Sequence, residues 1–335
     1  MENNDELLLK EFNNNYKSNL KLDCNKIDLF SSFILDKGLD LLCSINFHSK
    51  IEKIILEENN ITNITPLSHI SFGSNLISLD LSSNKISSID ILSKVNFPLL
   101  NHLYLNNNCI INIDSIYNFN FPNLFELNLS SNKISSIESL AKSKFPNLNE
   151  LLLSKNEITS IDALSNINFP KLKILTLNDN KISSIDSLSQ IKLENIRELK
   201  IEKNFLKNVN ALSKAKFHKL NYLSLGDDTL GDNIEDLKDT KFPKLQDICI
   251  YLKEKLKNNQ KVRKIIDFFE KKGVCFSFIK YDKKGEEIID KDNNFMYNND
   301  DEEDDDDMNN EQLIHNNNKP DDDNFNDFLL KEGLI

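Results

Sequence analysis

The stretch LFELNLSSNKISSIESLAKSKFPN, residues 124–147, decides the fold, because its pattern occurs eight times along the chain. Neighbouring copies read LNHLYLNNNCIINIDSIYNFNFPN from Leu100, LNELLLSKNEITSIDALSNINFPK from Leu148 and LKILTLNDNKISSIDSLSQIKLEN from Leu172. Further copies begin at Ile51, Leu76, Ile196 and Leu220, and a degenerate ninth opens at Leu245. A chain built from stacked copies presents a long continuous surface rather than a single enclosed pocket.

Each copy contains the pattern L-x-x-L-x-L-x-x-N, in which apolar residues alternate along the L-x-L piece. Alternation with a period of two indicates a short strand with one face turned inward. Strands at equivalent positions of successive copies stack about 4.8 Å apart and form a parallel sheet. We therefore expect a concave face on the order of 40 Å long.

An asparagine follows each predicted strand. A turn buried between copies leaves backbone groups without water, and these groups must find partners. A carboxamide both donates and accepts, so stacked asparagines can satisfy neighbouring turns. The sequence predicts a structural asparagine ladder formed by Asn59, Asn84, Asn108, Asn132, Asn156, Asn180 and Asn204. Asp228 takes this position in the eighth copy, which we expect to be the least regular.

A short helix and an aromatic residue complete each copy. One column holds mostly residue types that favour a helix N-cap: Thr65, Asp90, Asp114, Glu138, Asp162, Asp186 and Asn210. Most helices must be short, because a Phe-Pro pair follows and proline stops a helix. A buried apolar column is predicted at Phe72, Phe97, Phe121, Phe145, Phe169, Leu193, Phe217 and Phe242.

The full pattern L-x-x-L-x-L-x-x-N-x-I-x-x-I-x-x-L resembles the leucine-rich repeat, whose signature is L-x-x-L-x-L-x-x-N-x-L. The resemblance implies an α/β fold, a right-handed leucine-rich-repeat solenoid (horseshoe). Such a solenoid has a parallel β-sheet on its concave face and short helices on its convex face. The I-x-x-I-x-x-L segment is similar to the subclass of the protein phosphatase 1 regulator and the bacterial internalins. The regular Phe-Pro ending departs from that subclass, so the subclass stays open.

Charge is distributed unevenly along the chain. Residues 282–335 hold 19 acidic and 5 basic side chains, a net charge of −14, whereas the remainder holds 34 acidic and 36 basic, a net charge of +2. The unbroken acidic run from Asp300 to Asp307 lies in a segment with too little apolar area to offset its ordering entropy. We expect an N-terminal helical cap at 1–50, eight repeats plus a degenerate ninth at 51–250, a C-terminal cap (helix plus strand) at 251–291, and a disordered acidic tail at 292–335.

Gly38 is typical of a helix end within the first cap, where a degenerate first repeat is an alternative. The five cysteines are scattered, whereas secreted leucine-rich-repeat proteins commonly carry disulfide-bonded caps. Reduced thiols favour an intracellular protein, and we expect the cytoplasm, with the nucleus as the alternative. The start MENNDELLLKEF is acidic where a secretory signal is basic and then apolar. No segment approaches the length of a membrane span, so no membrane association is expected.

The side chains that flank and lie between the strand leucines face the concave side. Leu152 and Ile174 fall on adjacent strands, with Tyr104 two strands away from Leu152. Exposed apolar clusters ringed by polar residues often mark partner sites. Glu126 and Glu150 also fall on neighbouring strands. The candidate partner-binding residues are Ile55, Asp80, His102, Tyr104, Glu126, Asn128, Glu150, Leu152, Ile174, Glu198, Lys200 and Tyr222.

We predict no catalytic residue, no metal site and no cofactor. His102 and Tyr104 lie near Cys109 in sequence, but no carboxylate is placed to orient a His-Cys pair. The other histidines show no metal-ligand spacing with a cysteine, and there is no phosphate-binding glycine loop. The stretch from Lys253 to Lys264 is basic, but phosphate attraction needs sustained positive charge. The nearly neutral solenoid and the acidic tail therefore argue against nucleic acid.

These features favour a non-enzymatic interaction scaffold, a monomer whose concave face binds an unidentified protein partner. The glutamates on that face would suit a basic partner. A second hypothesis is an acidic-tailed regulator or chaperone of basic proteins, since the acidic leucine-rich nuclear phosphoproteins have a similar array and tail and bind histones. A third is a regulatory subunit of a phosphatase. The run from Lys94 to Phe97 matches the docking motif read by protein phosphatase 1, but Phe97 belongs to the predicted buried column.

Overall fold

The computed structural model describes residues 3–47, 50–226, 231–251, 260–281 and 287–289. All of these residues belong to the first of two compact units, Met1–Asn293. The acidic tail predicted at 292–335 and the irregular position predicted at Asp228 lie outside the described residues.

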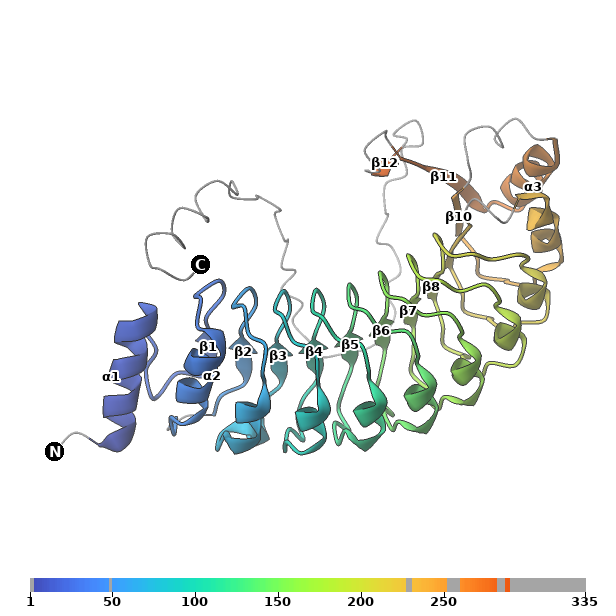
Figure 1. The fold of residues 1–335 in the computed structure, drawn as a ribbon. Helices are drawn as coiled ribbons and strands as arrows, with labels where there is room; N and C mark the ends of the chain where they lie inside the picture. Colours follow the sequence, from blue (N-terminus) through green and yellow to red (C-terminus); the bar gives the residue numbers. More distant parts are fainter. Residues whose placement is uncertain (1–2, 48–49, 227–230, 252–259, 282–286, 290–335) are drawn as a thin grey trace. The chain divides into compact units, whose positions relative to one another are not determined.

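A single open sheet forms the frame of this unit, and its strands follow one another in chain order (Figure 1). Strands β1 to β11 pair in parallel, whereas β12 pairs antiparallel with β11. The predicted solenoid with a parallel sheet is therefore confirmed. The bounds are β1 Lys26–Asp28, β2 Lys53–Ile55, β3 Ser78–Asp80, β4 His102–Tyr104, β5 Glu126–Asn128, β6 Glu150–Leu152, β7 Ile174–Thr176, β8 Glu198–Lys200, β9 Tyr222–Leu225, β10 Asp247–Tyr251, β11 Cys275–Tyr281 and β12 Glu287–Ile289.

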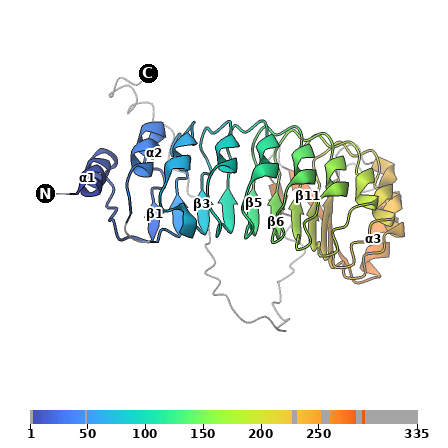
Figure 2. The ribbon, with the colours of Figure 1, turned by 90° about the horizontal axis from the view of Figure 1, so that it is seen from below.

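Short helices form a second row on the side of the repeats away from the strands (Figure 2). Within the repeats they are 3₁₀ helices, mostly of three to five residues, because each copy leaves room for little more than one turn. They are η1 Thr65–His69, η2 Gly73–Asn75, η3 Asp90–Ser93, η4 Asp114–Asn118, η5 Glu138–Lys142, η6 Asp162–Asn166, η7 Asp186–Ser189, η8 Asn210–Ser213 and η9 Gly231–Asp239. The α-helices of the described chain lie in the caps, at α1 Asn4–Tyr16, α2 Leu35–Cys43 and α3 Gln260–Glu270.

The predicted N-cap column opens these helices but does not cap them. Asp90 is the first residue of η3, and its N–H donates to Ser88 Oγ at 3.2 Å. A short polar side chain can accept a hydrogen bond from the backbone N–H two residues later in the chain. The prediction is therefore wrong by one position, because the N-cap of η3 is Ile89 and makes no side-chain cap hydrogen bond. The residues that accept such a bond from the N–H two positions later are Asn63, Ser88, Asn112, Ser136, Ser160, Ser184 and Asn208.

The seven asparagines after the strands are all buried, and each ties its own turn to the preceding copy. Asn132 Nδ2 donates to the carbonyl oxygens of Leu105 at 2.9 Å and of Leu129 at 3.1 Å. Its Oδ1 accepts from the N–H of Ile110 at 2.9 Å. One side chain thus satisfies backbone groups on two copies, which a buried turn requires.

The phenylalanine column is buried along its whole length, as predicted. Phe97 and Phe121 stack with ring centroids 6.2 Å apart, and Phe145 and Phe169 lie 5.9 Å apart. The column begins earlier than predicted, because the buried Phe47 packs edge-on against Phe72 at 5.2 Å.

The N-terminal segment contains a degenerate first repeat. Strand β1 pairs in register with β2, with Ile27 opposite Ile54, and helix α2 replaces the 3₁₀ turn. Gly38 lies inside α2, so the prediction that it ends a helix is wrong. A Cβ on Gly38 would lie 2.8 Å from Tyr16 Cζ of α1, so glycine allows the two helices to approach closely.

At the other end, β10 continues the sheet and pairs with both β9 and β11. Helix α3 covers this end with an apolar face on which Val262, Ile265 and Phe269 are buried. Amphipathic cover of this kind is what the last repeat of a solenoid requires.

Candidate functional site

Strand register places the predicted partner-binding residues in two adjacent rows on one face of the sheet, which we call the concave face. The first row runs through His102, Glu126, Glu150, Ile174, Glu198 and Tyr222, and the second through Ile55, Asp80, Tyr104, Asn128, Leu152 and Lys200. The strand residues between the rows, such as Leu127, point into the core and are fully buried. All twelve side chains of the concave face are partly buried.

A hydrogen-bonded network joins β4 to β5. Tyr104 Oη donates to Glu126 Oε2 at 2.8 Å, and His102 Nδ1 lies 3.2 Å from the same oxygen. The rings of His102 and Tyr104 are nearly parallel with centroids 6.1 Å apart, and Phe125 lies 5.9 Å from His102. Burial, together with the neighbouring Glu126 carboxylate, raises the pKa of Tyr104, so the phenol stays protonated and continues to donate. Glu126 is thus held in a fixed position.

The next strand adds a second carboxylate. Glu150 lies directly opposite Glu126 in the register, so two like charges face the same solvent about 5 Å apart. Burial and the Glu126 charge raise the pKa of Glu150. Among the described residues no lysine or arginine forms an ion pair with either carboxylate, and His102 is the one basic side chain paired with Glu126. Within the described residues the acid pair therefore has no lysine or arginine at ion-pair distance, although the Lys173 charge partly offsets the rise in the pKa of Glu150.

Farther along, the acidic charge is partly compensated. Lys200 Nζ lies 3.2 Å from Glu198 Oε2 and 5.2 Å from the centroid of the Tyr222 ring. Burial is the main cause that raises the pKa of Tyr222. The Glu198 charge is thus paired within β8, whereas the carboxylates of β5 and β6 have no lysine or arginine partner among the described residues.

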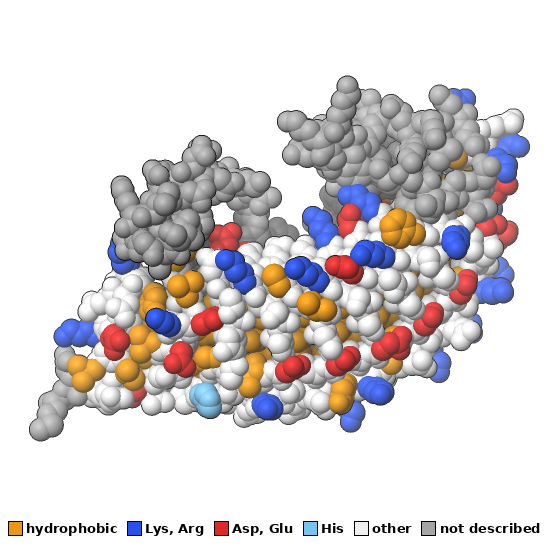
Figure 3. Space-filling view, viewed as in Figure 1, with side chains coloured by type: hydrophobic (Ala, Val, Ile, Leu, Met, Phe, Trp, Pro, Cys, Tyr) orange, Lys and Arg blue, Asp and Glu red, His pale blue; other side chains and the backbone are white. Residues whose placement is uncertain are grey.

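The apolar residues of the concave face are more dispersed than the sequence alone indicated. Ile174 lies opposite Glu150, whereas Leu152 lies opposite Thr176, so the two occupy different rows of adjacent strands. Asn128 separates Leu152 from Tyr104. The space-filling view shows apolar side chains interspersed with charged and polar ones along the repeats (Figure 3). Acidic and aromatic groups thus form a closer cluster than the aliphatic ones.

Sequence reasoning missed apolar residues at the margin of this face. Ile77 and Leu99 are 40% and 46% exposed, and Phe125 is half-buried beside His102. Ile77 and Phe125 share the position immediately before the first row, which in the other six of the eight copies is glutamate, asparagine, lysine or arginine. A comparison of equivalent positions across the copies is the signal that identifies them.

A family model described as leucine-rich repeats (2 copies) matches residues 146–190, which cover β6, η6, β7 and η7. The described repeats therefore have the leucine-rich-repeat fold. No curated protein sequence matches the chain.

Several solved leucine-rich-repeat structures are similar to it. An internalin (inlF) from Listeria monocytogenes is 20% identical, with 72% of this chain and 69% of that chain covered and a TM-score of 0.45. An internalin C2 (inlC2) from the same organism is 21% identical, with coverages of 64% and 83% and a TM-score of 0.49. The plant peptide hormone receptor RGFR1, in complex with RGF2, is 20% identical, with coverages of 64% and 41% and a TM-score of 0.40.

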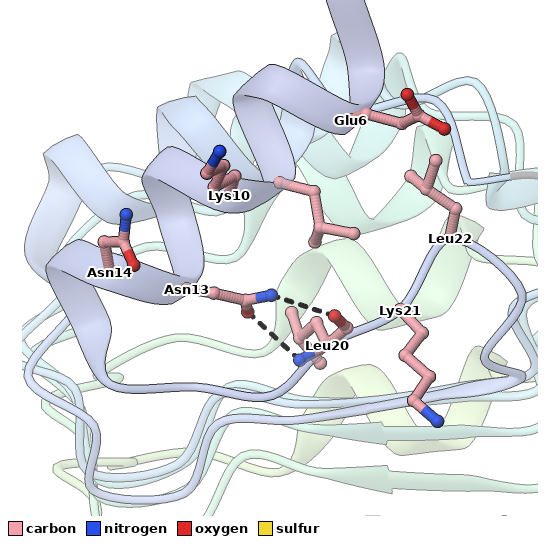
Figure 4. Close-up of a pocket in the computed structure, with 8 residues that line it drawn as sticks. Glu6, Lys10, Asn13, Asn14, Leu20, Lys21 and Leu22 are labelled. Atoms are coloured by element: carbon pink, nitrogen blue, oxygen red, sulfur yellow. Dashed lines mark hydrogen bonds between the residues drawn. The ribbon is translucent and has the colours of Figure 1, made fainter. Parts of the chain in front are cut away.

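A hollow of about 430 Å³ lies outside the concave face of this leucine-rich-repeat protein, between α1 and the loop that leads to β1 (Figure 4). Asn13 Nδ2 donates to the carbonyl oxygen of Leu20 at 2.9 Å, and Asn13 Oδ1 accepts from the Leu20 N–H at 3.0 Å. The central polar side chain is thus used to fix the loop to the helix. This hollow is part of the cap architecture.

Thiol chemistry is not favoured where the structure shows its environment. Burial raises the pKa of Cys43 to about 12, and burial also raises the pKa values of Cys24 and Cys275. A thiol reacts as its thiolate, so these groups are poor nucleophiles. Within the described ranges no cluster of three or more histidine, cysteine, aspartate or glutamate side chains is arranged to hold a metal ion. The helices in those ranges include none with the length and apolar character needed to cross a membrane.

Proposed function

We propose that this leucine-rich-repeat protein is a non-enzymatic interaction scaffold whose concave face binds a protein partner through basic side chains of that partner. The single observation that carries the proposal is the acid pair of Glu126 and Glu150. Burial and the facing Glu126 carboxylate disfavour the ionised form of Glu150. A partner's lysine or arginine would remove this penalty on binding.

The surroundings of the acid pair support recognition of a cation. Tyr104 and His102 fix Glu126, so little side-chain freedom is lost when a partner binds. Tyr104 and Phe125 add aromatic surface near the carboxylates, and aromatic rings interact favourably with ammonium and guanidinium groups. A charge pair that is partly shielded from water contributes more to binding than an exposed one.

Solenoids of stacked repeats present extended concave surfaces of this kind. The thiols with raised pKa values and the use of the N-terminal hollow for packing favour binding over catalysis. The proposed partner is therefore a protein whose interface carries lysine or arginine side chains along an extended segment.

The test is quantitative affinity capture from the native cell with the double variant Glu126→Gln and Glu150→Gln. Glutamine still accepts the bonds from Tyr104 and His102 but carries no charge. For proteins that the wild type captures, we expect the amount captured by the variant to be at least about ten-fold lower. Their binding to the wild type should weaken as salt rises.

The matched control is the double variant Asp162→Asn and Asp186→Asn, which removes the same charge from exposed positions on the helix side. It should capture the same proteins as the wild type. Equal capture by all three proteins would refute the concave site, and equal loss in both variants would assign the effect to net charge alone.

A further inference from the structure

A second charged surface lies on the flank where each 3₁₀ helix returns to the next strand. The segments 142–149, 166–173, 190–197 and 240–246 each hold two lysine or arginine residues, and the segment 214–221 holds three. Glu194 is the one acidic residue of these five segments, all of which the structure describes. The basic side chains are exposed throughout. We call this surface the basic flank.

Several basic residues converge on a hollow in the middle of the basic flank. This hollow, of about 410 Å³, is lined by Lys192, Lys216, His218 and Lys219, together with Glu194 and Asn195. Its basic groups come from two successive copies. Lys219 Nζ donates to Asn195 Oδ1 at 2.6 Å and so bridges the copies across the hollow.

Backbone hydrogen bonds between adjacent copies align neighbouring basic residues of the flank. The N–H of Arg197 donates to the carbonyl oxygen of Lys173 at 2.8 Å, so these two side chains project from adjacent copies. Copies are spaced about 5 Å apart at the sheet, and side chains on one face of an extended peptide are spaced about 6.6 Å apart. An extended segment can therefore present an acidic side chain to nearly every copy of the flank.

We propose that the basic flank binds an acidic peptide segment of a protein partner, with carboxylates held at the hollow between Lys192, Lys216 and Lys219. This goes beyond the proposed function, since it is a different surface with the opposite charge. A peptide fits better than a single-stranded nucleic acid, which needs aromatic platforms for its bases. The aromatic residues of these segments, Phe145, Phe169, Phe217 and Phe242, are buried in the core column.

The test uses a fluorescent peptide of about eight residues, long enough to span several copies, with alternating glutamate and glycine. Its binding to the full chain is measured by anisotropy at low and high salt. The variant carries Lys192→Gln, Lys216→Gln and Lys219→Gln. The control carries Lys85→Gln, Lys133→Gln and Lys155→Gln, which removes three exposed charges from other positions of the repeat.

We expect the flank variant to weaken binding about ten-fold or more, while the control changes it by less than about two-fold. Equal weakening in both variants would reduce the effect to net charge and overturn the proposal, as would unchanged binding in both. A thermal melt of each variant excludes loss of folding, and a variant that melts early is replaced by Lys192→Gln alone. Tighter binding of a single-stranded DNA of matched charge would also overturn it, in favour of nucleic acid.

Discussion

Glu150 occupies a position that favours function over stability. It is partly buried, faces Glu126 across one strand spacing, and its raised pKa shows that the ionised form is disfavoured in the folded chain. Two such charges in a watery environment repel by roughly 1 kcal/mol or less. Removing a residue that costs stability is expected to stabilise the fold and to weaken partner binding.

We therefore predict that Glu150→Gln raises the free energy of unfolding at neutral pH by about 0.5 kcal/mol, a value reduced for solvent screening because the side chain is only partly buried. The folded pKa lies above the ordinary value of 4.5, so the penalty is present above the folded pKa and absent below the ordinary one. Denaturant unfolding of both proteins from neutral to acidic pH measures this. The gain should vanish as the pH falls through the range in which Glu150 takes up its proton.

Glu157→Gln is the matched control, because its carboxylate is exposed and its hydrogen bond with Lys181 lowers its pKa. That substitution should not stabilise the chain. A Glu150→Gln gain that persisted unchanged at acidic pH would show that charge is not its cause.

At the scale of elements, the two N-terminal helices approach each other closely at Gly38. A Cβ at Gly38 would lie 2.6 Å from Ile34 Cβ and 2.8 Å from Tyr16 Cζ. Alanine has a helix propensity about 1 kcal/mol better than that of glycine. Overpacking a tight contact costs typically 1–3 kcal/mol, about as much as or more than the propensity gain.

We predict that Gly38→Ala lowers thermal stability in spite of its better helix propensity. Lys37→Ala is the control, because Lys37 is exposed on the same helix and its replacement should change the melting temperature little. Circular dichroism melts of the two variants and the wild type provide the measurement. A higher melting temperature for Gly38→Ala would show that α1 and α2 can separate without loss.

These elements also show how far the sequence alone reaches. The buried columns were predictable, because a repeated position meets its own copies above and below and needs only periodicity to be identified. Gly38 was not predictable, since its role depends on where Tyr16 arrives from a different helix. The N-cap of η3 was misplaced from Ile89 to Asp90, because aspartate is a favoured cap residue whereas isoleucine is not, and only the structure shows where the helix begins.

The charged surfaces could be identified only from the sequence and the fold together. The rows of the concave face followed from the repeat pattern, but only the fold shows that no lysine or arginine of the described residues forms an ion pair with Glu126 or Glu150. Net charge concealed the basic flank, because acidic and basic groups nearly cancel when they are summed over the solenoid. The fold separates them by placing different repeat positions on different sides.

At the scale of the whole described unit, we expect a destabilising substitution to affect mainly the copies next to it. Each copy of a solenoid contacts mainly its neighbours, so a defect at an end and a defect in the middle have different reach. Phe47 lies at the start of the aromatic column with Phe72 as its neighbour, whereas Phe145 lies in the middle against Phe169. Truncating either phenylalanine to alanine costs about 3–5 kcal/mol at the site itself.

We predict that Phe47→Ala increases hydrogen exchange in α1, β1, α2 and β2 but leaves β5 to β8 protected, because the first copies can fray without the rest. Phe145→Ala should raise exchange on both sides of its copy, since both halves lose an interface. Hydrogen exchange with mass spectrometry on the full chain distinguishes the two patterns. A uniform rise in exchange after Phe47→Ala would show that the chain unfolds as one cooperative block, and the nearest-neighbour account of this solenoid would then be wrong.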